Sequence, residues 1–122
     1  MISNFLKVVD LSKYNDICLD AIRESEVGNY SFIKGDSSYD TNKQFLFTSK
    51  LIPLAKEIQL NISNYTEEFE LEKSVMSSSW FNILYKGGVV EKHQHAESWN
   101  DEKGSMISGA YYPYVEENSC PL

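Results

Sequence analysis

The chain has 122 residues, of which 42% are apolar and 13% aromatic, and its formal charge at neutral pH is −7. This length and apolar content are enough for one folded domain with a hydrophobic core, which excludes a disordered chain. Lys and Arg form no basic cluster, so the charge argues against nucleic acid and anionic membranes as partners. The acidic residues are spread out, which is typical of a solvated surface.

The sequence predicts a cytoplasmic protein. Residues 1–10 lack the basic region and long apolar run of a secretory signal. No stretch approaches the roughly 18 apolar residues that can span a bilayer. Cys18 and Cys120 lie near opposite ends of the chain, so no disulfide framework is expected.

The first part of the chain is expected to form a short strand and then a helix. Residues 5–11 are apolar and β-branched enough for the strand. Ser12 can cap the helix, and Gly28 can end it. The apolar face of this helix is made of Ile17, Ala21 and Ile22, with Cys18 as a small core residue beside it. Residues 29–43 are rich in Ser, Asp, Gly and Asn, which predicts a loop.

The second helix is the clearest regular element of the sequence. Thr48 or Ser49 can cap it, and Pro53 is tolerated because it falls in the first turn. Apolar residues recur at spacings of three and four, which predicts a stripe that packs on a sheet. The stripe consists of Leu51, Leu54, Ala55, Ile58, Ile62, Tyr65 and Phe69.

Alternating strands are expected after the second helix. Residues 75–86 form the first, and Gly87-Gly88 is a hairpin signal that leads into a partner strand over residues 89–95. Residues 105–112 form a third strand. The chain is therefore predicted to be a single α+β domain over residues 1–122. In this domain, residues 1–72 are mainly helical support and residues 73–122 are strands.

Both histidines of the chain, His93 and His95, lie in the predicted partner strand. Residues two apart in a strand share a face, roughly 6–7 Å apart, so the two imidazoles can close on one metal ion. Non-haem iron sites use two histidines and one carboxylate. Glu91, or a loop acid such as Glu97, Asp101 or Glu102, can supply that carboxylate. The alternative is that both histidines are half-exposed strand residues without a metal.

The residues around this pair resemble a family of 2-oxoglutarate- and Fe(II)-dependent oxygenases that is common in marine bacteria and phages. The resemblance rests on the order Ser79-Trp80-Phe81-Asn82, Lys86-Gly87-Gly88, His93-Gln94-His95 and Ser108-Gly109-Ala110-Tyr111-Tyr112. It covers residues 79–122. It implies a double-stranded β-helix (jelly roll), Fe(II), 2-oxoglutarate as cosubstrate, and hydroxylation of an unknown substrate. His93 falls at the family's first iron ligand, and His95 falls where the carboxylate of a His-x-Asp motif usually sits.

Two features depart from the family pattern. Residues 96–104 are partly an insertion. No third histidine follows His95, and the single arginine, Arg23, lies in the first helix instead of following the histidines to pair with 2-oxoglutarate. We therefore expect an incomplete jelly roll, namely an N-terminal portion of an oxygenase that is inactive by itself. Its unpaired sheet edges predict a homodimer, which sedimentation can test.

The chain is also similar to the first metal-binding motif of cupins. Gly87, His93, His95, Glu102 and Gly109 follow that pattern, although the gap before Glu102 is too long. This alternative gives a cupin-like, non-catalytic module that binds a metal or small ligand through His93, His95 and Glu102. A third hypothesis is an interaction domain in which the histidines have no role.

Three further residues are predicted to bind the cosubstrate. Asn82 either points into the pocket or forms hydrogen bonds within the sheet. Tyr111 and Tyr112 face opposite ways, so one is expected in the core and the other to donate its hydroxyl proton to a bound acid. The residues do not identify a catalytic acid, base or nucleophile.

Overall fold

The structure is a computed structural model that describes residues 5–30, 33–87 and 107–116. Over these ranges the chain is α+β, as predicted, with two α-helices and one small antiparallel sheet. The helices are α1 (Asn15–Arg23) and α2 (Ile52–Glu68), and the strands are β1 (Gly28–Tyr30), β2 (Ile33–Ser37) and β3 (Asn82–Ile83). Within the described ranges, short 3₁₀ helices lie before α1, namely η2 (Ser12–Tyr14), and between β2 and α2, namely η3 (Phe45–Phe47) and η4 (Ser49–Leu51).

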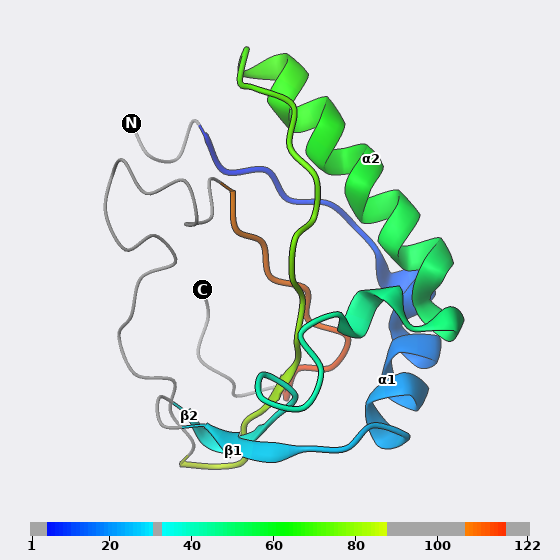
Figure 1. Ribbon diagram of the computed structural model, residues 1–122, viewed down its shortest axis with the longest axis vertical. Coiled ribbons are helices and arrows are strands. Elements are labelled where there is room, and N and C mark those ends of the chain that lie inside the picture. Colours follow the sequence, from blue (N-terminus) through cyan, green and yellow to red (C-terminus); the bar gives the residue numbers. More distant parts are fainter. Residues whose placement is uncertain (1–4, 31–32, 88–106, 117–122) are drawn as a thin grey trace.

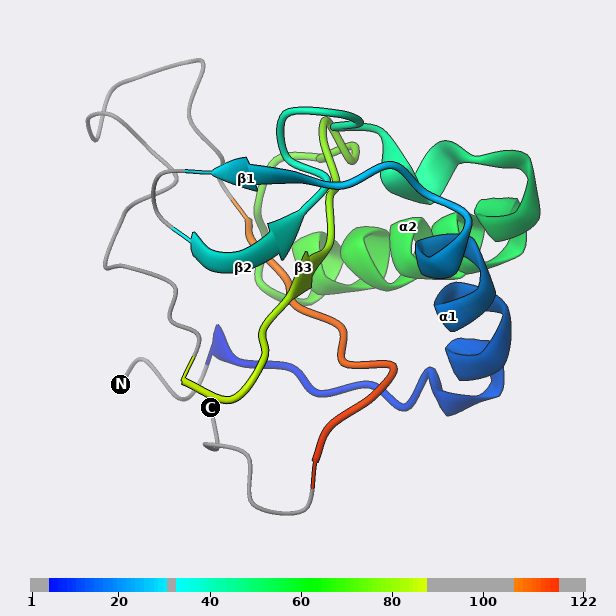
Figure 2. The same cartoon turned by 90° about the horizontal axis from the view of Figure 1, so that it is seen from below.

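The helices and the sheet lie on different sides of the molecule. Figure 1 shows α2 above α1 along one side and the strands at the base. Figure 2, seen from below, shows the sheet beside the helices rather than stacked on them. From the end of α2 the chain runs back beside this helix as an irregular segment and reaches the sheet at β3. The sheet order is β1-β2-β3.

The first helix forms where it was predicted, but its ends are made differently. The Ser12 side chain does not cap it; instead the Ser12 N–H donates to the Asp10 carboxylate at 2.9 Å, and η2 leads directly into α1. The buried face is centred on Cys18 and Ala21, so Cys18 is confirmed as a core residue. Gly28 does not end the helix, because α1 stops at Arg23 and Gly28 begins β1.

The structure confirms most of the prediction for the second helix. Pro53 lies in the first turn, and Leu51, Leu54 and Ala55 are buried. The capping prediction is wrong, because no side chain caps the helix: the Thr48 hydroxyl donates to the Phe45 carbonyl at 3.0 Å and accepts no helix N–H, and the residue before α2 is Leu51. The apolar stripe packs mainly on η3 and η4 and not on the strands. The core cluster is made of Cys18, Ala21, Phe45, Leu51, Leu54 and Phe81.

The predicted loop over residues 29–43 is wrong in its first half, where β1 and β2 pair as antiparallel strands. β2 also pairs with β3, so that Asp36 faces Ile83 and Ser37 faces Asn82. β1 and β2 are close in sequence, whereas β3 comes from a segment more than 40 residues away. Gly35 lies so close to this partner that an added Cβ would collide with the Ile83 carbonyl.

A set of buried hydrogen bonds joins residues 37–38 to residues 81–82. The Ser38 N–H donates to the Phe81 carbonyl, and the Phe81 N–H donates to the Ser38 hydroxyl, each at 3.0 Å. The Ser37 hydroxyl donates to Asn82 Oδ1 at 2.8 Å and accepts the Tyr39 N–H at 3.0 Å. Ser37 and Ser38 are almost completely buried, so these bonds satisfy polar groups that water does not reach.

Three predicted strands differ from the structure. Residues 6–11 form no strand; side chains hold this segment on α2, with Lys7 2.8 Å from the Glu68 carboxylate. Between residues 75 and 86, only β3 and one parallel bridge from Ser79 to Gln44 are regular. Residues 107–112 form no strand, and residues 88–95 and 105–106 lie outside the described ranges. Gly87 has a φ of +84°, as the predicted turn requires.

Replacing Gly35 with alanine should destabilise the sheet. The new Cβ meets the Ile83 backbone, so β2 and β3 must separate, and we expect a loss of about 1–3 kcal/mol of unfolding free energy. Urea denaturation measures it. Gly109→Ala is the matched control, because no atom of the described residues lies within 4 Å of its Cβ position. Equal stability of the two variants would contradict the close approach.

Replacing Ser38 with alanine should leave the buried Phe81 N–H without its acceptor. The expected cost is about 1–3 kcal/mol, the usual penalty for an unsatisfied buried donor. Thermal and urea unfolding of this variant can be compared with those of Ser78→Ala, a substitution at an exposed serine. If both variants unfold like the parent chain, the bond between residues 38 and 81 does not stabilise the fold.

Candidate functional site

The predicted metal ligands His93, His95 and Glu102 lie outside the described residues. Among the residues that the structure does describe, no group of three or more His, Cys, Asp or Glu side chains is placed to hold a metal ion. The geometry of the remaining predicted site residues, Asn82, Tyr111 and Tyr112, is defined.

Asn82 forms a hydrogen bond within the sheet, which was one of its two predicted roles. It lies in β3, and its Oδ1 accepts the Ser37 hydroxyl proton. The residues before it are anchored as well: the Ser79 hydroxyl accepts the Leu46 N–H at 3.0 Å, and Trp80 meets the Tyr39 ring edge-on at 4.8 Å. Residues 79–82, the first of the four motifs of the resemblance, therefore connect β2, η3 and the segment between them.

The two tyrosines differ in the way that their alternation predicted. Tyr111 packs against the core, and its hydroxyl donates to Asn15 Oδ1 at 2.6 Å, at the start of α1. Burial, with a smaller contribution from Cys18, raises the pKa of Tyr111 to about 12, so this hydroxyl stays protonated at neutral pH. Tyr112 is 50% exposed. Of the pair, Tyr112 is the more exposed residue.

Cys18 is the free cysteine of the described chain, and it is buried in α1. Burial raises the pKa of its thiol from 9.0 to about 11. The thiolate is the reactive form of cysteine, so this residue is not a nucleophile at neutral pH. Cys18 fills space in the core cluster together with Leu54, and Tyr111 packs against this cluster.

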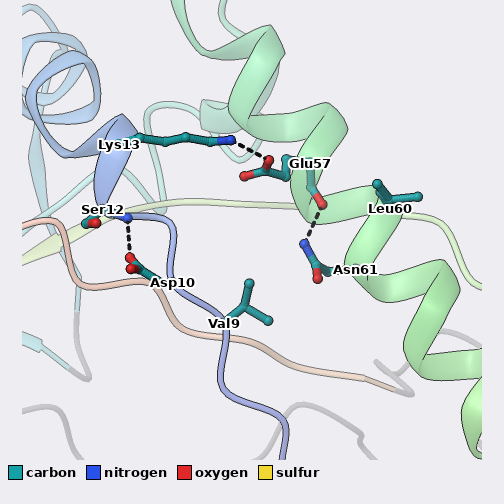
Figure 3. A pocket seen from close by; sticks show the side chains of 7 residues that line it. All are labelled: Val9, Asp10, Ser12, Lys13, Glu57, Leu60 and Asn61. Atoms are coloured by element: carbon teal, nitrogen blue, oxygen red, sulfur yellow. Dashed lines mark hydrogen bonds and ion pairs between the residues drawn. The ribbon is translucent and has the colours of Figure 1, made fainter.

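A groove of about 350 Å³ separates the N-terminal segment from α2 (Figure 3). Val9 and Leu60 line it, together with Asp10 from the N-terminal segment and Asn61 from α2. Lys13 crosses between the two elements and pairs with Glu57 at 2.9 Å. The sequence predictions missed this groove, because Lys13 and Glu57 are far apart in the chain and only the fold brings them together.

A second, apolar groove of about 280 Å³ lies on another part of α2. It is lined by Phe47, Ile52, Ala55, Lys56, Gln59 and Met76. Gln59 closes one side of it, because its Nε2 donates to the Ser74 carbonyl at 2.9 Å and its Oε1 accepts the Met76 N–H at 3.0 Å. These bonds fix the irregular chain after α2 against the helix.

No family model matches this chain, and no curated protein or solved structure is significantly similar to it. Among the helices of the described residues, none is long and apolar enough to cross a membrane.

The buried Cys18 thiol should make stability depend on pH above neutrality. Below pH 9 both states keep the proton; between pH 9 and about 11 the unfolded chain loses it while the folded chain does not. The unfolding free energy should therefore fall as the pH rises through this window. Urea unfolding of Cys120→Ser, with and without Cys18→Ala, isolates the effect. Identical pH profiles for the two proteins would contradict it.

Proposed function

We propose that this chain binds Fe(II) and 2-oxoglutarate as a member of the oxygenase family that its motifs resemble, and that it is built on a jelly roll. The observation that carries the proposal is the order of four motifs, at residues 79–82, 86–88, 93–95 and 108–112. The conformation of Gly87 supports it, because a φ of +84° is what a glycine turn between two strands uses.

His93, His95 and Glu102 form the metal site in this proposal. Two imidazoles and one carboxylate are the donors of mononuclear non-haem iron centres, so the chemistry of this set fits Fe(II). Bound iron supplies the activation of dioxygen, and the protein supplies the ligands and a dry pocket. The carboxylate completes the set because two neutral imidazoles alone leave the charge of the cation largely uncompensated.

Tyr112 is the tyrosine that we assign to the acid of 2-oxoglutarate. Its side chain is half exposed, whereas the Tyr111 hydroxyl is already used by Asn15 in the core. A phenol can donate its proton to a carboxylate oxygen. Asn82 contributes from the sheet, since its bond to Ser37 fixes the strand that leads to the turn at Gly87.

The proposal predicts that the chain binds Fe(II) through its histidines. Anaerobic calorimetric titration should give micromolar binding that 2-oxoglutarate tightens, and His93→Ala should abolish it. Gln94→Ala is the matched control: it lies between the two histidines, and in a strand its side chain faces the opposite way. The control should bind like the parent chain. Tyr112→Phe should reduce only the effect of 2-oxoglutarate.

The outcomes separate the alternatives. Binding that ignores 2-oxoglutarate would favour the cupin-like module without catalysis. A stoichiometry of one iron for two chains would indicate that a second copy supplies a ligand. Absence of binding, or equal binding by the parent chain and His93→Ala, would overturn the proposed iron site.

A further inference from the structure

Residues 5–10 form a strap that is held against α2 and has no role in the proposed metal site. Figure 1 shows this segment, in dark blue, leading to the start of α1, and residues 6–10 are neither helix nor strand. Every residue of the strap is exposed. Among the described residues, no backbone hydrogen bond joins residues 6–10 to another segment. The strap therefore depends on the contacts at its two ends.

The carboxyl end of the strap is anchored in the core. Leu11, the next residue, packs against the core cluster, and its carbonyl accepts the Tyr14 N–H at 2.9 Å. The Tyr111 hydroxyl lies 3.4 Å from the same carbonyl. Leu11 therefore belongs to the folded body, and it is the point about which the strap can turn.

The amino end of the strap is held on the last turns of α2 by side chains. The Phe5 and Phe69 rings lie 5.2 Å apart between their centres, and the Tyr65 hydroxyl donates to the Phe5 carbonyl at 2.5 Å. Lys7 Nζ lies 2.8 Å from the Glu68 carboxylate and 5.8 Å from the Phe69 ring centre. All of these contacts are exposed to water, so each contributes little stability.

Between its two ends the strap passes over an unfilled groove. Val9 from the strap and Leu60 from α2 both line the groove of about 350 Å³, and both remain about half exposed. Leu6 and Val8 are 70% and 88% exposed. The middle of the strap thus buries little apolar surface and adds little to the stability of the closed form. A segment with so few buried contacts can open locally at a small cost in free energy.

We propose that the strap opens as a unit about Leu11 while the rest of the fold stays intact, and that ionic strength controls this opening through the pair of Lys7 and Glu68. Salt screens an exposed ion pair, whereas it has little effect on a ring contact or on a hydrogen bond between neutral groups. Higher salt therefore shifts the balance toward the open form.

The opening changes the surface that α2 presents. In the closed form the ring of Phe69 is in contact with Phe5, and Val9 and Asp10 form one wall of the groove. In the open form both of these contributions are lost, and the apolar side chains at the end of α2 become accessible. The strap is thus a conformational device that couples ionic strength to the exposure of this helix.

Trypsin cleavage after Lys7 under native conditions tests the proposal. Trypsin requires a locally unfolded segment, so at low protease concentration the cleavage rate follows the population of the open form. A synthetic peptide of residues 2–12 gives the rate for a fully open strap and corrects for the effect of salt on trypsin. We expect the chain to be cut after Lys7 more slowly than the peptide, but faster than after Lys50 in η4. Between about 0.02 and 0.5 M NaCl the corrected rate should rise about twofold.

Variants separate the ion pair from the other contacts. Glu68→Gln should raise the rate at low salt by about two- to fivefold and abolish its salt dependence. Glu67→Gln is the matched control, since it removes the same charge from the next residue of α2, which forms no ion pair with the described residues. It should behave like the parent chain. Tyr65→Phe keeps the ring and loses only the bond to the Phe5 carbonyl, so it should raise the rate and keep the salt dependence.

Three results would overturn the proposal. Cleavage after Lys7 that is no faster than cleavage after Lys50 would mean that the strap opens only when the whole fold unfolds. Cleavage at the rate of the peptide would mean that the strap is never closed. Equal rates for Glu68→Gln and Glu67→Gln would mean that the ion pair does not control the opening.

Discussion

The buried hydrogen bonds that join Ser37 and Ser38 to Phe81 and Asn82 (the buried join) are the constraint on which the described fold depends. It connects segments more than 40 residues apart, and each of its polar groups would cost free energy if left unpaired away from water. The join holds Phe81 in the core, where its ring meets Phe45 at 4.8 Å. Ser79 extends the join to η3, which precedes α2. The segment of residues 79–82 is therefore a structural anchor in this chain.

The sequence predicted the elements whose cause is local. The turn-by-turn spacing of Leu51, Leu54 and Ala55 and the position of Pro53 are enough to place α2. For α1 the helix was predicted, but its buried side is centred on Cys18 and Ala21, whereas Ile17, expected on the apolar face, is exposed. The sequence predictions failed where an element depends on residues that are far away in the chain. Residues 29–43 look like a loop because their polar side chains suit turns, yet β2 is a strand that pairs with β1 on one side and with the distant β3 on the other.

The predictions for the candidate sites also succeeded where the cause is local and failed where it is distant in sequence. A strand over residues 105–112 predicted that Tyr111 and Tyr112 differ; residues 107–112 form no strand, and the contact with Asn15 decides which tyrosine is in the core. The β-branched residues after Phe5 predicted a strand, whereas the structure gives them no partner strand and holds them through Lys7 and α2. The groove beside Val9 could not be predicted, because it depends on the packing of two segments that are far apart in sequence.

Native-state hydrogen exchange tests most directly whether the join organises the fold. The account predicts that the Phe81 and Ser38 amide protons exchange only through global unfolding, because both are bonded within the buried join. The amide of Val8, in the exposed N-terminal segment, should exchange through local motion and therefore much faster. If the Phe81 amide exchanged as fast as the Val8 amide, the join would open without unfolding the rest, and the central claim would be wrong.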